Sequence, residues 1–179
     1  MVKKQHHELS HEFPEGVQAE FSDKILKVKG AKGELSRMFY YPGVSLKLEG
    51  RNLTISAETE TKQLKAMLGT FIAHASNMGK GVSDGYTYDL KVVFSHFPMT
   101  IKQVGNVIEI NNFLGEKVPR LAKVIGASDV KIEKDRIEIT GINKEDVSQT
   151  AANIEQSTKV KRRDVRVFQD GVYITNKSK

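Results

Sequence analysis

The sequence predicts an α+β protein built from two tandem duplicated domains, each a small, mainly antiparallel sheet with one helix packed on a face. Three observations lead to this prediction. Short runs place apolar residues at every second position, an apolar stripe with helical spacing follows each set of runs, and the whole pattern recurs about 82 residues further along the chain. Because the strands come first and the helix last, the pattern favours α+β over α/β architecture.

The composition of the chain limits its class. Of its 179 residues, 39% are hydrophobic and 28% are charged, as expected of a folded protein with one medium domain or two small ones. The lack of cysteine excludes disulfides, thiolate metal sites and cysteine nucleophiles. Apolar runs are no longer than three or four residues, and the N-terminus lacks the apolar core of a signal peptide. We therefore expect a soluble, cytoplasmic protein without a membrane span.

The first copy opens with alternating runs that predict strands. In residues 24–29, Leu26 and Val28 alternate with lysines, which is typical of a strand with one solvent-facing side. Residues 45–49 and 53–55 also alternate, and they flank a glycine-containing turn at 50–52. Two such runs around a tight turn predict a β-hairpin.

A helix is predicted after this hairpin. Its apolar residues recur at intervals of three and four along one face: Leu64, Met67, Leu68, Phe71, Ile72, Ala75 and Met78. Thr59 is the expected N-cap, because its hydroxyl can accept a hydrogen bond from an unpaired amide of the first turn. Gly79 is the expected end of the helix.

The second copy repeats these elements in the same order. Residues 108–110 repeat the first strand, and residues 130–139 repeat the hairpin. The second helix is predicted over 143–158, where Asn143 and Asp146 resemble a capping box. A period this long is typical of a duplicated domain and not of a solenoid repeat.

One long strand is predicted between the copies, over residues 86–97, where aromatic and aliphatic residues alternate with polar ones until Pro98. These patterns divide the chain into three parts. They are a polar N-terminal tail over 1–15, a first α+β repeat over 16–85, and a second α+β repeat over 86–179 with a basic C-terminal end.

Two motifs suggest chemistry that the rest of the sequence does not support. Residues 7–11 match the H-E-x-x-H pattern of zinc proteases, but that site requires a buried helix and a third ligand, whereas this pattern lies in the polar tail. The glycine-rich residues 79–85 have the spacing of neither a P-loop nor a dinucleotide fingerprint, so a helix end and turn explain them better. No Ser/His/Asp set or carboxylate pair stands out, so we expect no enzyme activity, no metal site and no cofactor.

Positive charge is concentrated at the C-terminal end. Residues 159–179 hold seven Lys and Arg against two Asp, which accounts for +5 of the net +6. Such a block indicates contact with a polyanion, although a solubilising tail is the simpler alternative. A last strand is predicted over 167–174, in which Phe168 and Tyr173 fit core positions better than stacking platforms. This arrangement favours contact with the backbone of folded RNA over stacking on single-stranded bases.

Four blocks of sequence, in the same order, resemble the ribosomal protein L6 family of the large subunit, in its archaeal–eukaryotic branch. They are residues 69–78 (GTFIAHASNM) with Gly81 and Val82, 95–98 (SHFP), 112–117 (NFLGEK) and 164–173 (DVRVFQDGVY). The resemblance implies a structural constituent of the large ribosomal subunit. It further implies binding to large-subunit RNA near the sarcin–ricin loop, beside the site of the translational GTPases, and contact with neighbouring ribosomal proteins.

The resemblance also names candidate RNA-binding residues in the second domain. Asn112, Gly115 and Lys117 belong to a loop expected to face RNA, where Gly115 would allow close backbone approach and Lys117 would meet phosphate. The further RNA contacts expected beside the last strand are Lys161, Arg162, Arg163 and Arg166. Neither DNA nor a membrane is an expected partner. The alternative function is a free-standing translational module that binds RNA or protein.

Overall fold

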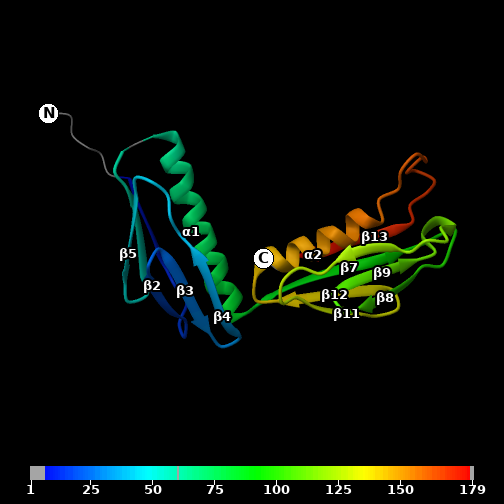
Figure 1. Cartoon of the computed structure of the whole chain (residues 1–179), viewed down its shortest axis with the longest axis horizontal. Helices are drawn as coiled ribbons and strands as arrows, with labels where there is room; N and C mark the ends of the chain where they lie inside the picture. Colours follow the sequence, from blue (N-terminus) through cyan, green and yellow to red (C-terminus); the bar gives the residue numbers. More distant parts are fainter. Residues whose placement is uncertain (1–6, 60, 178–179) are drawn as a thin grey trace. The chain divides into compact units, whose positions relative to one another are not determined.

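The computed structural model describes residues 7–59 and 61–177, and it divides into two units at Gly85 and Tyr86 (Figure 1). Each unit contains antiparallel strands and one long helix. The predicted α+β class with a duplicated domain is therefore confirmed. Each unit is described by itself below.

Unit 1, residues 1–85, contains two three-stranded antiparallel sheets and helix α1. In the first sheet, with order β2-β3-β4, Leu26 and Val28 of β3 are fully buried, as their alternation predicted. The second sheet, with order β1-β6-β5, holds the predicted hairpin as β5 and β6. The strands are β1 (His7–Glu12), β2 (Gln18–Ser22), β3 (Ile25–Gly30), β4 (Gly33–Met38), β5 (Val44–Glu49) and β6 (Asn52–Ala57).

Helix α1 (Lys62–Ser83) buries most of the predicted apolar stripe, with Met67 and Ile72 only partly buried, but it differs from the prediction at both ends. Its N-cap is Thr61, whose hydroxyl accepts a hydrogen bond from the Leu64 amide, and not Thr59. At the other end the helix continues through Gly79 to Ser83. Gly79 packs closely against Phe13, the residue after β1, since a Cβ there would lie 3.1 Å from the Phe13 ring. Residues 79–83 of the glycine-rich segment are thus the last turn of the helix, and Asp84 and Gly85 follow it.

The prediction of a polar tail is wrong for residues 7–12. They form strand β1, which is paired along its length with β6. Phe13, directly after this strand, is almost completely buried. Polar residues at most positions of β1 concealed the strand, which depends on backbone pairing with β6 and on Phe13. Residues 1–6 lie outside the described residues.

Unit 2, residues 86–179, repeats this plan and adds one strand. Its sheets have the orders β10-β9-β8 and β11-β12-β7-β13, and every neighbouring pair is antiparallel. The elements are β7 (Tyr86–Val93), β8 (Thr100–Val104), β9 (Val107–Asn111), the short 3-10 helix η1 (Phe113–Gly115), β10 (Arg120–Lys123), β11 (Asp129–Ile132), β12 (Arg136–Gly141), α2 (Lys144–Ser157) and β13 (Gly171–Lys177).

The two units correspond element by element, with one exception. Strands β2, β3 and β4 match β8, β9 and β10, while β1, β6 and β5 match β7, β12 and β11. The register shows the match directly, because Ile55 of β6 faces Leu9 of β1 as Ile139 of β12 faces Tyr88 of β7. Strand β13 has no counterpart in the described part of unit 1.

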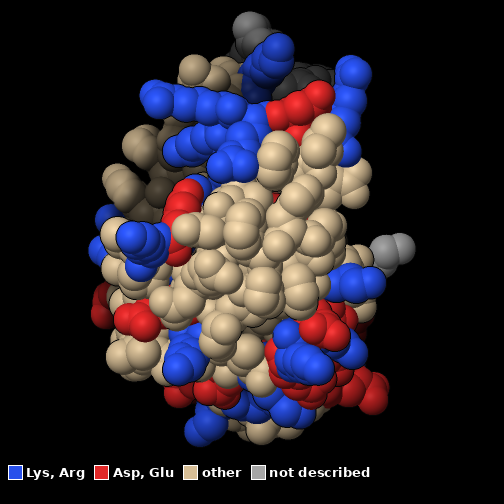
Figure 2. All heavy atoms as spheres, turned by 90° about the vertical axis from the view of Figure 1, so that its right-hand side faces the viewer, with Lys and Arg blue, Asp and Glu red and all other residues tan. Residues whose placement is uncertain are grey.

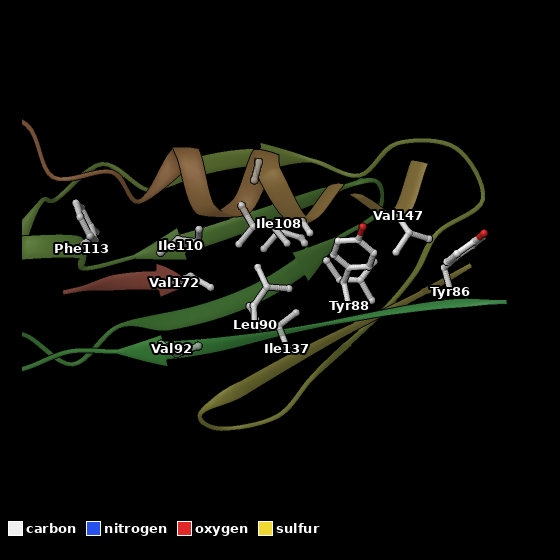
Figure 3. Close-up of a cluster of buried hydrophobic side chains, with 14 residues drawn as sticks. Tyr86, Tyr88, Leu90, Val92, Ile108, Ile110, Phe113, Ile137, Val147 and Val172 are labelled. Atoms are coloured by element: carbon white, nitrogen blue, oxygen red, sulfur yellow. The ribbon is translucent and has the colours of Figure 1, made fainter. Parts of the chain in front are cut away.

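The core of unit 2 lies between α2 and the sheets (Figure 3). Leu90, Ile137 and Val172 come from three neighbouring strands and are fully buried beneath α2, which contributes Val147 and Ile154. Burying one such side chain contributes about 1.5–3 kcal/mol, so this cluster holds the sheet and the helix together. The predicted Asn143 N-cap is confirmed, although it accepts its hydrogen bond from the Glu145 amide.

The last strand is shorter than predicted. Strand β13 begins at Gly171 and not at Val167, and residues 158–170 form an irregular segment between α2 and this strand. Tyr173 is also not a core residue, since 43% of it is exposed, and Phe168 is only partly buried. Alternation in sequence was misleading here, because contacts with distant residues such as Ser95 and His96 determine the path of the chain.

Candidate nucleic-acid interface

The residues between α2 and β13 carry most of the predicted site. We call residues 159–166 the basic segment, and its four predicted RNA contacts, Lys161, Arg162, Arg163 and Arg166, all lie exposed. Figure 2 looks onto this end of unit 2, and Lys and Arg side chains gather at the top of the view, where Figure 1 places the chain that follows α2. The structure thus places these four cations at one end of unit 2.

The basic segment is followed by a turn that is fixed by two aspartates. The carbonyl of Asp164 accepts hydrogen bonds from the Val167 and Phe168 amides, and its carboxylate accepts one from the Arg166 amide at 2.9 Å. Asp170, which is completely buried, accepts hydrogen bonds from the amides of Ser95 and His96 at 2.7 and 3.4 Å. The segment is therefore anchored to the end of β7 and is not a loose tail.

Two aromatic rings and one guanidinium group form a stack next to Asp170. The His96 and Phe168 rings lie 4.8 Å apart and are nearly parallel, with an angle of 27° between their planes. The guanidinium of Arg163 lies 4.6 Å from the centre of the Phe168 ring. A cation held over an aromatic face keeps a defined direction. Arg163 is therefore positioned by the fold more firmly than a solvated surface arginine.

The predicted loop over residues 112–117 contains η1 and three consecutive or near-consecutive left-handed residues: Asn112, Leu114 and Gly115. The Asn112 side chain donates a hydrogen bond to the Pro98 carbonyl at 3.0 Å. A Cβ on Gly115 would lie 3.4 Å from the Phe97 ring. Both residues therefore contact the rest of unit 2, and Lys117 is the predicted residue of this loop that presents an exposed charge.

Arg120 connects this loop to the basic segment. Its guanidinium donates two hydrogen bonds to the Glu116 carboxylate, at 2.7 and 2.8 Å, and others to the carbonyls of Ser157 and Lys159 at 2.8 and 3.3 Å. It also lies 4.2 Å from the centre of the Phe113 ring. Two segments about 40 residues apart in sequence are thus joined through one side chain.

The electrostatics of Glu116 agree with this connection. Hydrogen bonds from Arg120 lower the pKa of Glu116, and the charges of Arg120 and Arg163 act in the same direction. The geometric link between the loop and the basic segment is Arg120, which is hydrogen-bonded to both the Glu116 carboxylate and the Lys159 carbonyl. The carboxylate therefore stays ionised and keeps the cations around it in place.

Sequence reasoning missed the residues that organise the site, namely Arg120, His96 and Asp170. Arg120 follows Glu116 by four residues, a spacing that suggests an ion pair only within a helix, and here the pair spans a loop and a strand. The contact of Asp170 with Ser95 joins positions 75 residues apart, for which one sequence offers no signal.

An apolar surface lies beside the cations. Val118 is 75% exposed and Val165 is 63% exposed, and Phe97, Leu121 and Val167 are also exposed. Uncharged atoms cover the centre of the view in Figure 2, below the Lys and Arg side chains. Exposed apolar area next to clustered charge indicates a contact surface rather than an ordinary solvated face.

The rejected zinc motif is placed in strand β1 and not in a helix. Four residues of a strand span about 13 Å, whereas two ligands of one metal must lie within one helical turn in this motif. Burial lowers the pKa of His11, whose ring lies edge-on against Phe13. Among the described residues, no cluster of three or more His, Cys, Asp or Glu could hold a metal ion, and no helix is long and apolar enough to cross a membrane.

Comparison with known proteins gives a consistent result. The sequence model of the family described as "Ribosomal protein L6" matches residues 13–85 and 97–171, one stretch in each unit. The "Large ribosomal subunit protein uL6" of Methanosarcina mazei is 48% identical over 167 residues, which cover 93% of this chain and 95% of the relative. The proteins of the same description from Methanobrevibacter smithii and Methanocella arvoryzae are 51% and 46% identical, covering 93% of this chain and 93% and 95% of the relatives.

Proposed function

The chain belongs to the ribosomal protein L6 family, and on this premise we propose that the end of unit 2 described above binds large-subunit ribosomal RNA. As a member of this family it is a structural ribosomal protein of the cytoplasm and not an enzyme, as the sequence predicted. Within the proposal, Lys117 and the cations of the basic segment contact phosphates, while Asn112 and Gly115 shape the loop that presents Lys117.

The observation that supports this proposal most strongly is the connection through Arg120. It ties the basic segment to the loop at 112–117, so cations from two distant parts of the sequence share one ordered surface. Phosphate contacts hold an RNA in register only when the cations themselves are fixed. Anchoring by Asp170 and stacking of Arg163 on Phe168 supply the same order at the other end of the segment.

We further propose, from the family resemblance of the four sequence blocks, that this surface lies near the sarcin–ricin loop. Transient translational GTPases and neighbouring ribosomal proteins are then its protein partners. The exposed apolar residues beside the cations are compatible with such protein contacts, because RNA backbone alone does not require them.

A pair of matched variants tests the RNA-binding surface. Replacing Lys161, Arg162 and Arg163 with alanine removes three exposed cations, and replacing Lys24, Lys27 and Lys29 removes the same charge from unit 1. Each cation that neutralises a phosphate contributes somewhat under one unit to the slope of log affinity against log salt. We expect the unit 2 triple to weaken binding to large-subunit RNA and to reduce that slope by about two units, and the unit 1 triple to have little effect.

Equal losses from the two triples, measured as binding isotherms at several salt concentrations, would show that net charge and not a positioned surface binds the RNA. Co-sedimentation with large subunits in high salt distinguishes a built-in component from the alternative, a free-standing translational module. A built-in component remains bound, whereas a module that binds transiently is released.

A further inference from the structure

A groove lies between the last turn of α2, the basic segment and the start of β13. Its volume is about 430 Å³, which is within the range of about 300–1,000 Å³ typical of sites for small ligands. Val160, Val165 and Tyr173 line it with mainly apolar surface, and Gln156 and Lys159 add polar groups. Glu155, Gln156 and Tyr173 have no role in the phosphate contacts proposed above, while Lys159, Val160 and Val165 belong to the basic segment itself.

The groove is preformed, because hydrogen bonds fix its walls. The Tyr173 hydroxyl donates to the Gln169 carbonyl at 3.1 Å, which holds the ring across the start of β13. Gly171 makes room for that ring, since a Cβ there would lie 3.2 Å from it. On the other wall, the Glu155 carboxylate accepts a hydrogen bond from the Ile174 amide at 3.0 Å. A ligand therefore binds without the entropic cost of ordering these side chains.

The chemistry of the groove matches a flat, partly polar ring. An exposed aromatic face offers a stacking partner, and the valines contribute apolar contact on the sides. The carboxylate of Glu155 retains the capacity to accept another hydrogen bond, and the Gln156 amide can both donate and accept. Carboxylates and amides are the groups that pair with the amino-bearing edges of nucleobases.

The positive charges around the groove indicate which kind of molecule supplies the ring that binds in it. Lys159 lies on its lining, and the next cations are Lys161, Arg162 and Arg163 of the same segment. An RNA backbone held by these cations passes beside the groove, so a base turned out of its stack can enter. An uncharged aromatic side chain of a protein would gain nothing from the same positive surroundings, whereas a nucleotide brings its ring together with a negative phosphate.

We propose that this groove binds one unstacked base of the RNA whose phosphates lie on the basic segment, stacked on Tyr173 and hydrogen-bonded to Glu155 or Gln156. The acceptor groups favour a base with an exocyclic amino group, namely adenine, guanine or cytosine, over uracil. This inference rests on the RNA-binding function proposed above and adds a base-specific contact to it.

The test compares the full-length protein with three variants in binding to large-subunit RNA. Tyr173→Ala removes the stacking partner and should weaken binding by about tenfold, in line with the usual loss of a base–aromatic stack. Tyr173→Phe keeps the ring but removes the hydroxyl, and it should bind within about twofold of the unchanged protein. Val165→Trp fills the groove from an exposed position without disturbing the core, and it should reproduce the loss.

Salt dependence separates this contact from the phosphate contacts. Stacking releases no counterions, so Tyr173→Ala and Val165→Trp should lower affinity at every salt concentration with the slope unchanged. Chemical probing of Watson–Crick edges should reveal one base that is protected by the unchanged protein and by Tyr173→Phe. The same base should become reactive with Tyr173→Ala and with Val165→Trp.

Several results would overturn the proposal. One is unchanged affinity for Tyr173→Ala and Val165→Trp while the Lys161, Arg162 and Arg163 triple still loses binding, in which case RNA binding stands and the groove plays no part in it. Another is unchanged RNA affinity with impaired incorporation into large subunits, which would assign the groove to a neighbouring protein. Failure of the unchanged protein to bind the RNA would instead contradict the proposed function itself.

Discussion

Units 1 and 2 share one scaffold but differ in what surrounds it. In unit 2, β7 is paired on both sides, with β12 and β13, whereas in the described part of unit 1 its counterpart β1 pairs with β6 alone. The register aligns HELSHE of β1 with YTYDLK of β7, so a half-buried histidine, His11, occupies the place of the buried Leu90. With both edges paired, β7 is a central strand in which Tyr86, Leu90 and Val92 are among the buried residues.

The two units also differ in their charge. Unit 1 holds 12 Lys and Arg against 10 Asp and Glu, and the last 21 residues of unit 2 hold seven against two. The added strand and the basic segment both follow α2, at the point where the shared plan ends. The comparison teaches that the duplicated scaffold is common to both units, and that the candidate RNA site is built from what unit 2 adds to it and from the loop at 112–117.

The largest effect is expected from equivalent core substitutions. Ile55 and Ile139 occupy the same position in the two units and are fully buried, so replacing either with alanine should lower the free energy of unfolding of its unit by about 2–5 kcal/mol. Hydrogen exchange resolved by segment measures each unit separately. RNA binding should weaken only with Ile139→Ala. Equal acceleration of exchange in both units by either variant would show that they unfold as one.

A smaller effect is expected at Asp170, an anchor that belongs only to the addition in unit 2. Asp170→Ala leaves the amides of Ser95 and His96 without their acceptor, which should cost about 1–3 kcal/mol of unfolding free energy. RNA affinity should fall because the basic segment loses its attachment, and the salt slope should fall by less than in the Lys161, Arg162 and Arg163 triple because the cations themselves remain. Thermal unfolding and binding isotherms measure both effects.

The control for this variant is Asp129→Ala, which removes an exposed carboxylate of β11 and so changes net charge equally. If it altered stability and RNA affinity as much as Asp170→Ala, the effect would come from charge alone and the anchoring role would be wrong.

A pH-dependent difference between the units is expected from Asp89. Its side chain accepts hydrogen bonds from Arg136 at 2.7 Å and from Asn176 at 3.2 Å, whereas the register places Ser10 at the equivalent position of unit 1. The hydrogen bond from Arg136 lowers the pKa of Asp89 below its ordinary value. The stabilisation is therefore complete above the unfolded-state pKa of about 3.9 and is lost as the pH falls from there through the lower folded-state pKa.

Asp89→Asn should accordingly reduce the stability of unit 2 at neutral pH and make its unfolding less sensitive to acid below about pH 4. Unit 1 should show no change in either respect. Segment-resolved hydrogen exchange at several pH values measures this, and an acid sensitivity of unit 2 that persists in the variant would assign the effect to other carboxylates.

The smallest effect is expected from the histidines of β1. Replacing His7 and His11 with alanine should leave RNA binding and ribosome incorporation unchanged, because both belong to unit 1 and to a strand that cannot present a helical zinc site. A metal assay on the purified protein should find no zinc in either form. Stoichiometric zinc that disappears with the double replacement would show that His7 and His11 do bind a metal.

Much of the fold was predictable because its signals are local. Alternation in β3, β6 and β12 and the helical stripes of α1 and α2 reflect burial on one side of each element, which the order of residues records directly. Strand β1 and the continuation of α1 through Gly79 were not predictable in this way. Strand β1 pairs with β6, and Gly79 packs against Phe13, so both involve partners far away in the sequence.

The candidate site shows the same difference between local signals, which could be predicted, and tertiary contacts, which could not. The sequence by itself determined which residues carry the charge, since the cations are concentrated in one block after the second helix. Only the tertiary structure decided that Arg120 joins this block to the loop at 112–117, that Asp170 anchors it to the end of β7, and that Tyr173 faces a groove instead of the core. The physical reason is that charge is a property of single residues, whereas position depends on hydrogen bonds between residues up to 75 positions apart, which no local pattern encodes.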